Sequence, residues 1–124
     1  MGMDKFELQT RLKQFALRVI KLVDHMPRSI SADAISKQIV RSGTSPSANY
    51  RAACIAKSEK DFLNKLKMVE EELDETSHWL EIIMETEMLP ESRVRPLYEE
   101  NIELLKINIS ALKTLRNKFD KIEK

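Results

Sequence analysis

The stretch "FLNKLKMVEEELDETSHWLEII", residues 62–83, decides the fold of this 124-residue chain. Its inward-facing positions recur at alternating spacings of four and three residues: Phe62, Leu66, Val69, Leu73, Thr76, Leu80 and Ile83. Because an α-helix turns once every 3.6 residues, these side chains form a single stripe. Ser58, followed three residues later by Asp61, is typical of a helix start. The stretch predicts an amphipathic helix over about residues 58–88 that packs against other helices.

Three other parts of the chain carry stripes of nearly the same spacing. Their members are Leu8, Leu12, Phe15, Val19, Leu22 and Met26; then Ile35, Ile39, Ser42, Pro46, Asn49 and Ala53; then Tyr98, Ile102, Leu105, Ile109, Leu112, Leu115, Phe119 and Ile122. They predict helices over about residues 4–26, 32–56 and 92–121. Four amphipathic helices with short connections predict an all-α fold, an antiparallel up-down-up-down four-helix bundle, as one domain over residues 1–124.

The second of these helices contains the unusual stretch "IVRSGTSPSANYRAA", residues 39–53. The stripe keeps its register through Pro46, so we expect one helix that is kinked near this proline, which has no N–H to donate. Ser42 and Gly43 are small and would let a neighbouring helix approach closely. The hydroxyls of Thr44, Ser45 and Ser47 are interpreted as partners of nearby backbone groups, because no nucleophile-elbow or phosphate-loop motif surrounds them.

Composition limits the kind of protein. Charged residues make up 33% of the chain and aromatic residues 6%, and there are two glycines. The first ten residues, "MGMDKFELQT", lack the apolar core of a signal peptide, and no run is long enough to span a membrane. The single cysteine, Cys54, cannot form an internal disulfide. We therefore expect a cytoplasmic protein in which Cys54 acts as a small hydrophobic residue.

One pair of residues suggests a metal site. Glu75 and His78 have the Glu-x-x-His spacing of the di-iron sites found in four-helix bundles. Such a site needs a second motif, but Leu22 stands where His25 would require a glutamate. The stripe of residues 62–83 also turns Glu75 and His78 away from the core. The sequence therefore predicts no metal, no cofactor and no catalytic residue, and the chain is interpreted as a non-enzyme.

The acidic run around residues 70–75 needs nearby cations, and two arginines of the second helix are the candidates. We expect Arg41 and Arg51 to form structural ion pairs with Glu71 or Glu72, within the bundle or across a subunit interface, because guanidinium binds carboxylate bidentately.

Charge is distributed unevenly along the chain. Residues 1–57 hold ten Lys/Arg against four Asp/Glu, and residues 58–91 hold three against eleven. The opposite charges either pair inside the bundle or leave a basic face for an anionic partner. In the second case the candidate nucleic-acid-binding residues are Arg11, Arg18, Lys21, Arg28, Lys106, Lys113, Lys118 and Lys121. Contact with phosphates would be salt-sensitive and indifferent to sequence. The alternative is an adaptor that binds an acidic protein without nucleic acid.

Several apolar residues lie beside the stripes, where a single bundle cannot bury them all. Trp79 and Ile82 are the clearest of these, and we expect them at an oligomer interface.

Two motifs resemble a known bacterial family. The block from Arg41 to Ala53 and the run from Val69 to Leu80 are similar to the motifs of four-helix bundle proteins, a family also named for intervening sequences of 23S rRNA genes. The resemblance implies an up-down-up-down bundle that assembles into a homopentamer. A relative, the accessory variability determinant of diversity-generating retroelements, binds nucleic acid and a reverse transcriptase. The partners expected from the resemblance are therefore further copies of the chain, RNA or DNA, and a reverse transcriptase or other protein, with no membrane.

Overall fold

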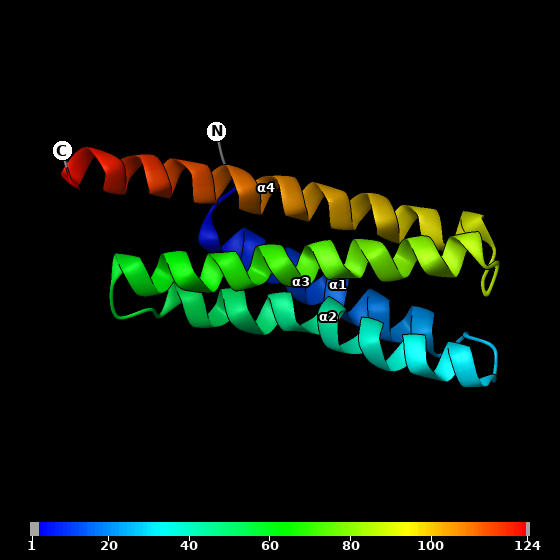
Figure 1. Ribbon diagram of the computed structural model, residues 1–124. Coiled ribbons are helices and arrows are strands. Elements are labelled where there is room, and N and C mark those ends of the chain that lie inside the picture. Colours follow the sequence, from blue (N-terminus) through cyan, green and yellow to red (C-terminus); the bar gives the residue numbers. More distant parts are fainter. Residues whose placement is uncertain (1–2, 124) are drawn as a thin grey trace.

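The computed structural model describes residues 3–123, with side chains for residues 3–120. Four helices follow one another along the chain: α1 (Lys5–Val23), α2 (Ile30–Cys54), α3 (Glu59–Glu85) and α4 (Glu91–Glu123). They run antiparallel in sequence order, with α1 and α3 at opposite corners and α2 and α4 between them (Figure 1). The described residues contain no strand. The predicted four-helix bundle is confirmed.

Short polar side chains start three of the helices. The side chains of Asp4, Ser29 and Ser58 accept hydrogen bonds from the backbone N–H groups of Glu7, Ala32 and Asp61, at 2.8, 3.1 and 3.1 Å. Because Ser29 caps α2, this helix begins two residues before the predicted start at residue 32. α1 ends at Val23, earlier than the predicted residue 26, because the backbone tightens there into turn bonds.

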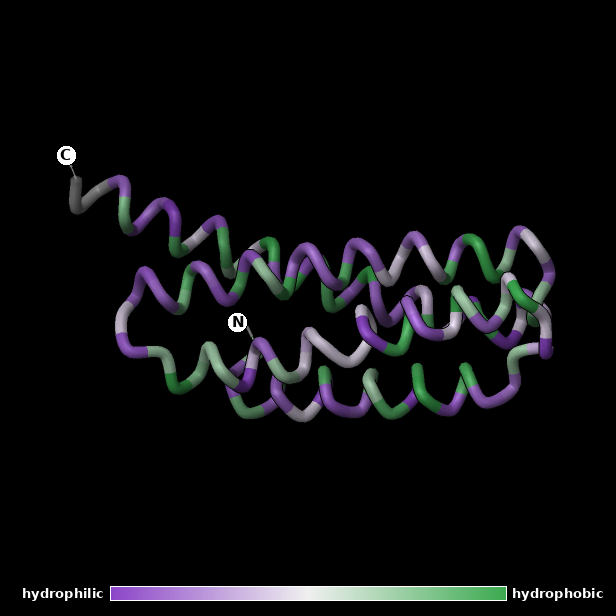
Figure 2. The backbone as a smooth tube through the Cα atoms, turned by 60° about the horizontal axis from the view of Figure 1, so that its bottom comes forward, coloured by the Kyte–Doolittle hydropathy of each residue, from purple (hydrophilic) through white to green (hydrophobic). Residues whose placement is uncertain are grey.

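The core consists of side chains from all four helices, and hydrophobic and hydrophilic residues alternate along each helix (Figure 2). The predicted stripes of α1 and α3 are buried as expected except for Met26 and Phe62, which are half-buried. The predicted stripe of α4 is wrong over its first half. Tyr98, Ile102 and Leu105 are half-buried and Ile109 is 45% exposed. The buried positions there are Val94, Leu97, Asn101, Leu104 and Asn108.

The two core asparagines connect α4 to α3. The amide nitrogens of Asn101 and Asn108 each donate to a carbonyl of α3, that of Leu73 and that of Leu66, at 2.9 Å in both cases. The donors lie seven residues apart, and so do the acceptors. The two bonds therefore fix how the two antiparallel helices are aligned.

α2 continues as one helix through Pro46. The hydroxyls of Thr44 and Ser45 donate to the carbonyls of Val40 and Arg41 at 2.6 and 2.7 Å, so the predicted bonds to local backbone groups are confirmed for these two of the three residues. Gly43 faces α1, and a Cβ atom added there would lie 2.8 Å from a methyl carbon of Val19. The glycine therefore permits the close approach of α1 and α2.

The connection from α3 to α4 contains a left-handed residue. Glu87 has a φ angle of 58°. The N–H groups of Glu87 and Met88 donate to the carbonyls of Met84 and Ile83 at 3.2 and 3.1 Å, which is the bonding pattern of a Schellman motif. Glycine is the usual residue at this position because it has no Cβ to clash.

Replacing Glu87 by glycine is expected to raise the free energy of unfolding by about 1 kcal/mol, because the strain of the left-handed backbone disappears. Glu85→Gly is the control, because Glu85 lies in the last turn of α3 and glycine costs about 1 kcal/mol inside a helix. Urea unfolding followed by circular dichroism measures both. If both variants changed the free energy of unfolding in the same direction, the explanation by backbone strain at Glu87 would be contradicted.

Candidate nucleic-acid interface

The antiparallel order decides which predicted cations come together. The C-terminal end of α1 lies beside the N-terminal end of α4, so Arg18 and Lys21 are at the opposite end of the bundle from Lys113 and Lys118 (Figure 1). The candidate residues of the two helices therefore do not form one continuous face.

Arg11 is the first correction to the candidate site. Its Nε and Nη2 atoms donate to the two carboxylate oxygens of Glu100 on α4, both at 2.7 Å. These hydrogen bonds raise the pKa of Arg11, and both side chains are partly buried. A bidentate pair of this kind uses two of the five N–H donors and neutralises the charge of the guanidinium, so Arg11 attracts a phosphate much less than an unpaired arginine does. Arg11 is therefore a structural residue that fastens α1 to α4.

The remaining predicted cations fall into separate groups. Lys118 forms an ion pair with Glu59 at the start of α3. Arg28, Lys106 and Lys113 are exposed, and none forms an ion pair among the described residues. The side chain of Lys121 lies outside the described residues.

Three cationic residues and a histidine gather at one end of the bundle. Their side chains surround a hollow of about 310 Å³. Arg18 and Lys21 belong to α1, His25 lies in the segment after α1, and Arg93 lies in the first turn of α4. We call these four residues the basic end cluster. All four are exposed, and the buried Leu22 and Leu97 complete the lining. The lining contains no acidic side chain, and no member of the cluster has an ion pair within the described chain.

His25 is held in place within this cluster. Its Nδ1 atom lies 2.8 Å from the carbonyl oxygen of Lys21. A carbonyl can only accept, so Nδ1 carries the proton and donates, which leaves Nε2 as the free ring nitrogen. The ring can therefore offer a second N–H to an anion when it is protonated.

Arg93 is absent from the candidate residues predicted from the sequence, although it lies at the start of the helix predicted over residues 92–121, in the segment "LPESRVRP", residues 89–96. The structure makes most of this segment the first turns of α4, which begins at Glu91. The signal that was available is topological: an up-down-up-down bundle places the start of its fourth helix beside the end of its first.

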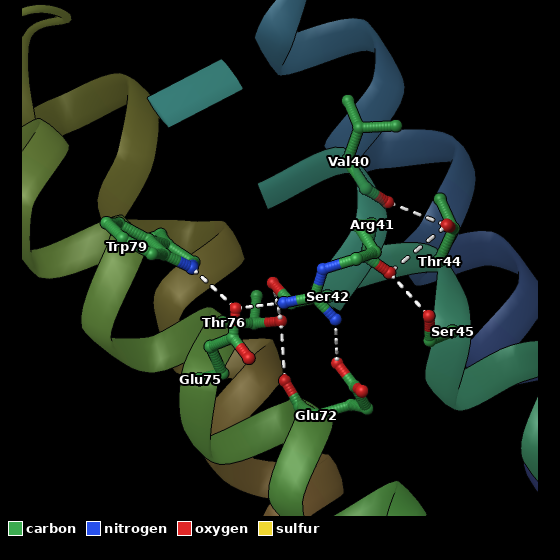
Figure 3. A network of polar contacts seen from close by, with 9 residues as sticks. All are labelled: Val40, Arg41, Ser42, Thr44, Ser45, Glu72, Glu75, Thr76 and Trp79. Carbon is green, nitrogen blue, oxygen red and sulfur yellow. Dashed lines mark hydrogen bonds and ion pairs between the residues drawn. The ribbon is translucent and has the colours of Figure 1, made fainter. Parts of the chain in front are cut away.

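Two residues of the acidic run of α3, Glu72 and Glu75, belong to a structural network (Figure 3). Arg41 donates to Glu72 at 2.9 Å and to Glu75, and the indole N–H of Trp79 donates to Glu75 at 3.0 Å. The bond from Trp79, aided by Arg41, lowers the pKa of Glu75. Beneath this network the buried hydroxyls of Ser42 and Thr76 are hydrogen-bonded at 2.9 Å.

The other members of the predicted ion pairs lie apart. Arg51 and Glu71 are exposed and form no ion pair within the described part of the chain. Trp79 and Ile82, predicted at an oligomer interface, are half-buried on α3. Among the residues with described side chains, no group of three or more His, Cys, Asp or Glu is arranged to hold a metal ion. None of the described helices has a stretch long and apolar enough to cross a membrane.

Comparison with known proteins agrees with the fold and the two motifs. A family model described as "23S rRNA-intervening sequence protein" matches residues 4–110. A crystal structure at 1.70 Å of a protein of unknown function, from the S23 ribosomal protein family of Bacteroides thetaiotaomicron VPI-5482, is 34% identical with a TM-score of 0.82, and the match covers 90% of this chain and 99% of that one. No curated protein matches the sequence. The chain belongs to the 23S rRNA-intervening sequence protein family.

Proposed function

We propose that the protein is a non-enzymatic, homo-oligomeric scaffold that binds the phosphate backbone of RNA or DNA through the basic end cluster. One observation carries the proposal: Arg18, Lys21, His25 and Arg93 surround one hollow that has no acidic residue in its lining. Cations placed so close together repel one another, and an anion between them relieves this repulsion.

The chemistry of the cluster favours phosphate over bases. Arginine binds phosphate oxygens bidentately, and lysine binds them as a point charge. No aromatic side chain other than the imidazole of His25 lines the hollow, so it offers little surface for base stacking. Binding should therefore depend strongly on salt and weakly on sequence.

Assembly of several copies would repeat a binding site that is weak in a single chain. One chain has a formal net charge of +1, so a single basic end cluster binds a polyanion weakly. In the homopentamer implied by the family resemblance, the cluster would repeat five times on one assembly, and each further contact would become intramolecular. This is how a nearly neutral chain would hold a nucleic acid.

A second candidate function rests on the other end of the bundle. There α4 extends beyond the start of α1 (Figure 1). A hollow of about 830 Å³ lies at this end among side chains of all four helices, most of them apolar, with Ser110, Thr114, Lys106 and Lys118 of α4 in the lining. An apolar hollow with lysines among its lining suits an acidic segment of a partner protein, such as a reverse transcriptase. The adaptor function would use this end and leave the basic end cluster unoccupied.

Fluorescence anisotropy with labelled structured RNA and duplex DNA, repeated across a salt titration, tests the proposal. We expect Arg18→Glu combined with Lys21→Glu to raise Kd at least about tenfold and to lower the salt slope by about two, because two phosphate contacts are lost. The matched control is Lys37→Glu with Arg51→Glu, two exposed residues of α2 that carry the same change in charge.

The control separates a site from a general charge effect. Equal weakening by the two double variants would mean that net charge alone drives binding, which contradicts a specific cluster. Absence of binding at low salt would contradict the nucleic-acid function and favour the adaptor. Arg11 is kept unchanged throughout, because Arg11→Glu would break its pair with Glu100 and place two carboxylates together.

A further inference from the structure

α1 carries a second stripe on the side that faces away from the core. Phe6, Thr10, Lys13, Leu17 and Ile20 recur at spacings of four, three, four and three residues. Phe6 is 78% exposed, Leu17 50% and Ile20 42%. Three large apolar side chains in helical register on an outer face form a surface that a partner helix can cover.

α3 carries a matching outer stripe. Met68, Glu71, Glu75, His78 and Ile82 recur at spacings of three, four, three and four residues. Met68 is 43% exposed, and Ile82 is half-buried beside Trp79. This stripe has the same heptad rhythm as the one on α1 but a different charge.

The two outer faces have opposite charge. Every charged residue between Leu8 and Val23 is basic, and every charged residue between Val69 and Met88 is acidic. Lys13 on α1 and Glu71 and Asp74 on α3 are exposed and form no ion pair within the described chain. A pairing of α1 with α1, or of α3 with α3, would bring like charges together, whereas α1 with α3 is complementary.

The bundle holds these faces so that they cannot meet within one chain. The backbones of α1 and α3 stay apart at opposite corners, and the outer sides of the two helices point away from each other (Figure 1). Each copy therefore presents one basic and one acidic apolar face to its surroundings. Such an arrangement joins copies head to tail, which closes into a ring when the rotation between neighbours is suitable.

We infer that the outer face of α1 in one copy docks on the outer face of α3 in the next copy, so that Leu17 and Ile20 are covered by this face and lie close to its acidic residues. The inference rests on the oligomeric state in the proposed function and names the surfaces that form it. The basic end cluster is not covered by this contact, because Arg18 of α1 and His25 of the segment after it line the hollow together with Arg93 of α4.

Light scattering after size-exclusion chromatography, without nucleic acid, tests the interface. Leu17→Glu is expected to reduce the mass to that of a single chain, because it removes an apolar contact and puts a carboxylate against an acidic face. Leu17→Lys removes the same apolar contact but keeps the charge complementary. The Kd for association of Leu17→Lys should therefore be at least about tenfold lower than that of Leu17→Glu. Ile30→Glu is the control, because Ile30 is also a large apolar residue on the surface, 93% exposed, but lies on neither stripe.

Rescue identifies the partner face. Adding Glu71→Lys to Leu17→Glu should restore a higher mass, since the introduced glutamate then meets a lysine on the neighbouring copy. Equal masses for Leu17→Glu and wild type, or no difference between Leu17→Glu and Leu17→Lys, would overturn the α1–α3 pairing. A monomeric wild type would overturn the pairing together with the oligomeric scaffold, while the anisotropy titration would still report on the basic end cluster by itself. Circular dichroism verifies that each variant remains helical.

Discussion

Replacing Asn101 with aspartate is expected to lower the free energy of unfolding by about 3–5 kcal/mol at neutral pH. Asn101 is 0% exposed, and its amide nitrogen donates to the Leu73 carbonyl at 2.9 Å and to the Ser77 hydroxyl at 2.6 Å. Aspartate has the same shape, so no cavity forms. Its ionised carboxylate has no proton to donate, and it would place a buried negative charge beside a carbonyl oxygen.

The loss should depend on pH in a defined direction. Burial raises the pKa of a carboxyl above its unfolded value, so between these two pKa values the folded variant binds more protons than the unfolded chain. Its stability therefore falls as pH rises through this window and recovers as pH is lowered toward the unfolded pKa. The protonated carboxyl can again donate to the Leu73 carbonyl, which adds to the recovery.

Urea unfolding at pH 5 and pH 7.5 measures both effects. Asn117→Asp is the matched control, because Asn117 is an exposed residue of the same helix and undergoes the same chemical change. Its stability should change by no more than about 0.5 kcal/mol. A loss at Asn101 that is independent of pH would contradict the hydrogen-bond explanation and indicate a packing defect instead.

These asparagines also show why the core of α4 was mispredicted. In α1 and α3 the buried positions are nearly all apolar, so the heptad rhythm identified them directly. In α4 the stripe contains Asn101 and Asn108, and an apolar alternative through Ile102 and Ile109 runs beside it. Periodicity can only count apolar residues, so it favoured the wrong face. The hydrogen bonds that make asparagine acceptable in the core depend on α3, which local sequence does not describe.

The candidate site, like the core of α4, could be predicted from the sequence only in part. The sequence identified Arg18 and Lys21 as candidate basic residues of the first helix, and neither forms an ion pair within the described part of the chain. It also identified Arg11, which differs only in having Glu100 across from it on α4. Whether a surface arginine is free or paired depends on which residue of the neighbouring helix lies opposite. That information comes from the relative alignment of the helices, and the same alignment brings Arg93 into the cluster.

Gly43→Ala is expected to lower the free energy of unfolding by about 1–3 kcal/mol, although alanine is the better helix former by about 1 kcal/mol. The reason is steric. The new Cβ would lie 2.8 and 2.9 Å from the two methyl carbons of Val19, which is fully buried on α1. Valine has a stiff χ1 angle, so its methyl groups cannot turn away without strain, and the two helices must separate instead.

A double-mutant cycle with Val19→Ala isolates this contact. In the Val19→Ala background both methyl carbons are gone, and only the Cβ atom of residue 19, at 3.2 Å, remains close to the new Cβ. A shift of a few tenths of an ångström relieves this contact, so Gly43→Ala should stabilise the protein by up to about 1 kcal/mol through helix propensity. The change of sign between the two backgrounds corresponds to a coupling of about 2 kcal/mol or more, measurable by urea unfolding. If Gly43→Ala lowered the free energy of unfolding equally in both backgrounds, glycine would be needed for the backbone of α2 near Pro46 and not for the contact with Val19. A change of sign would show that it serves the contact with α1, because only the removal of Val19 can convert the clash into a gain.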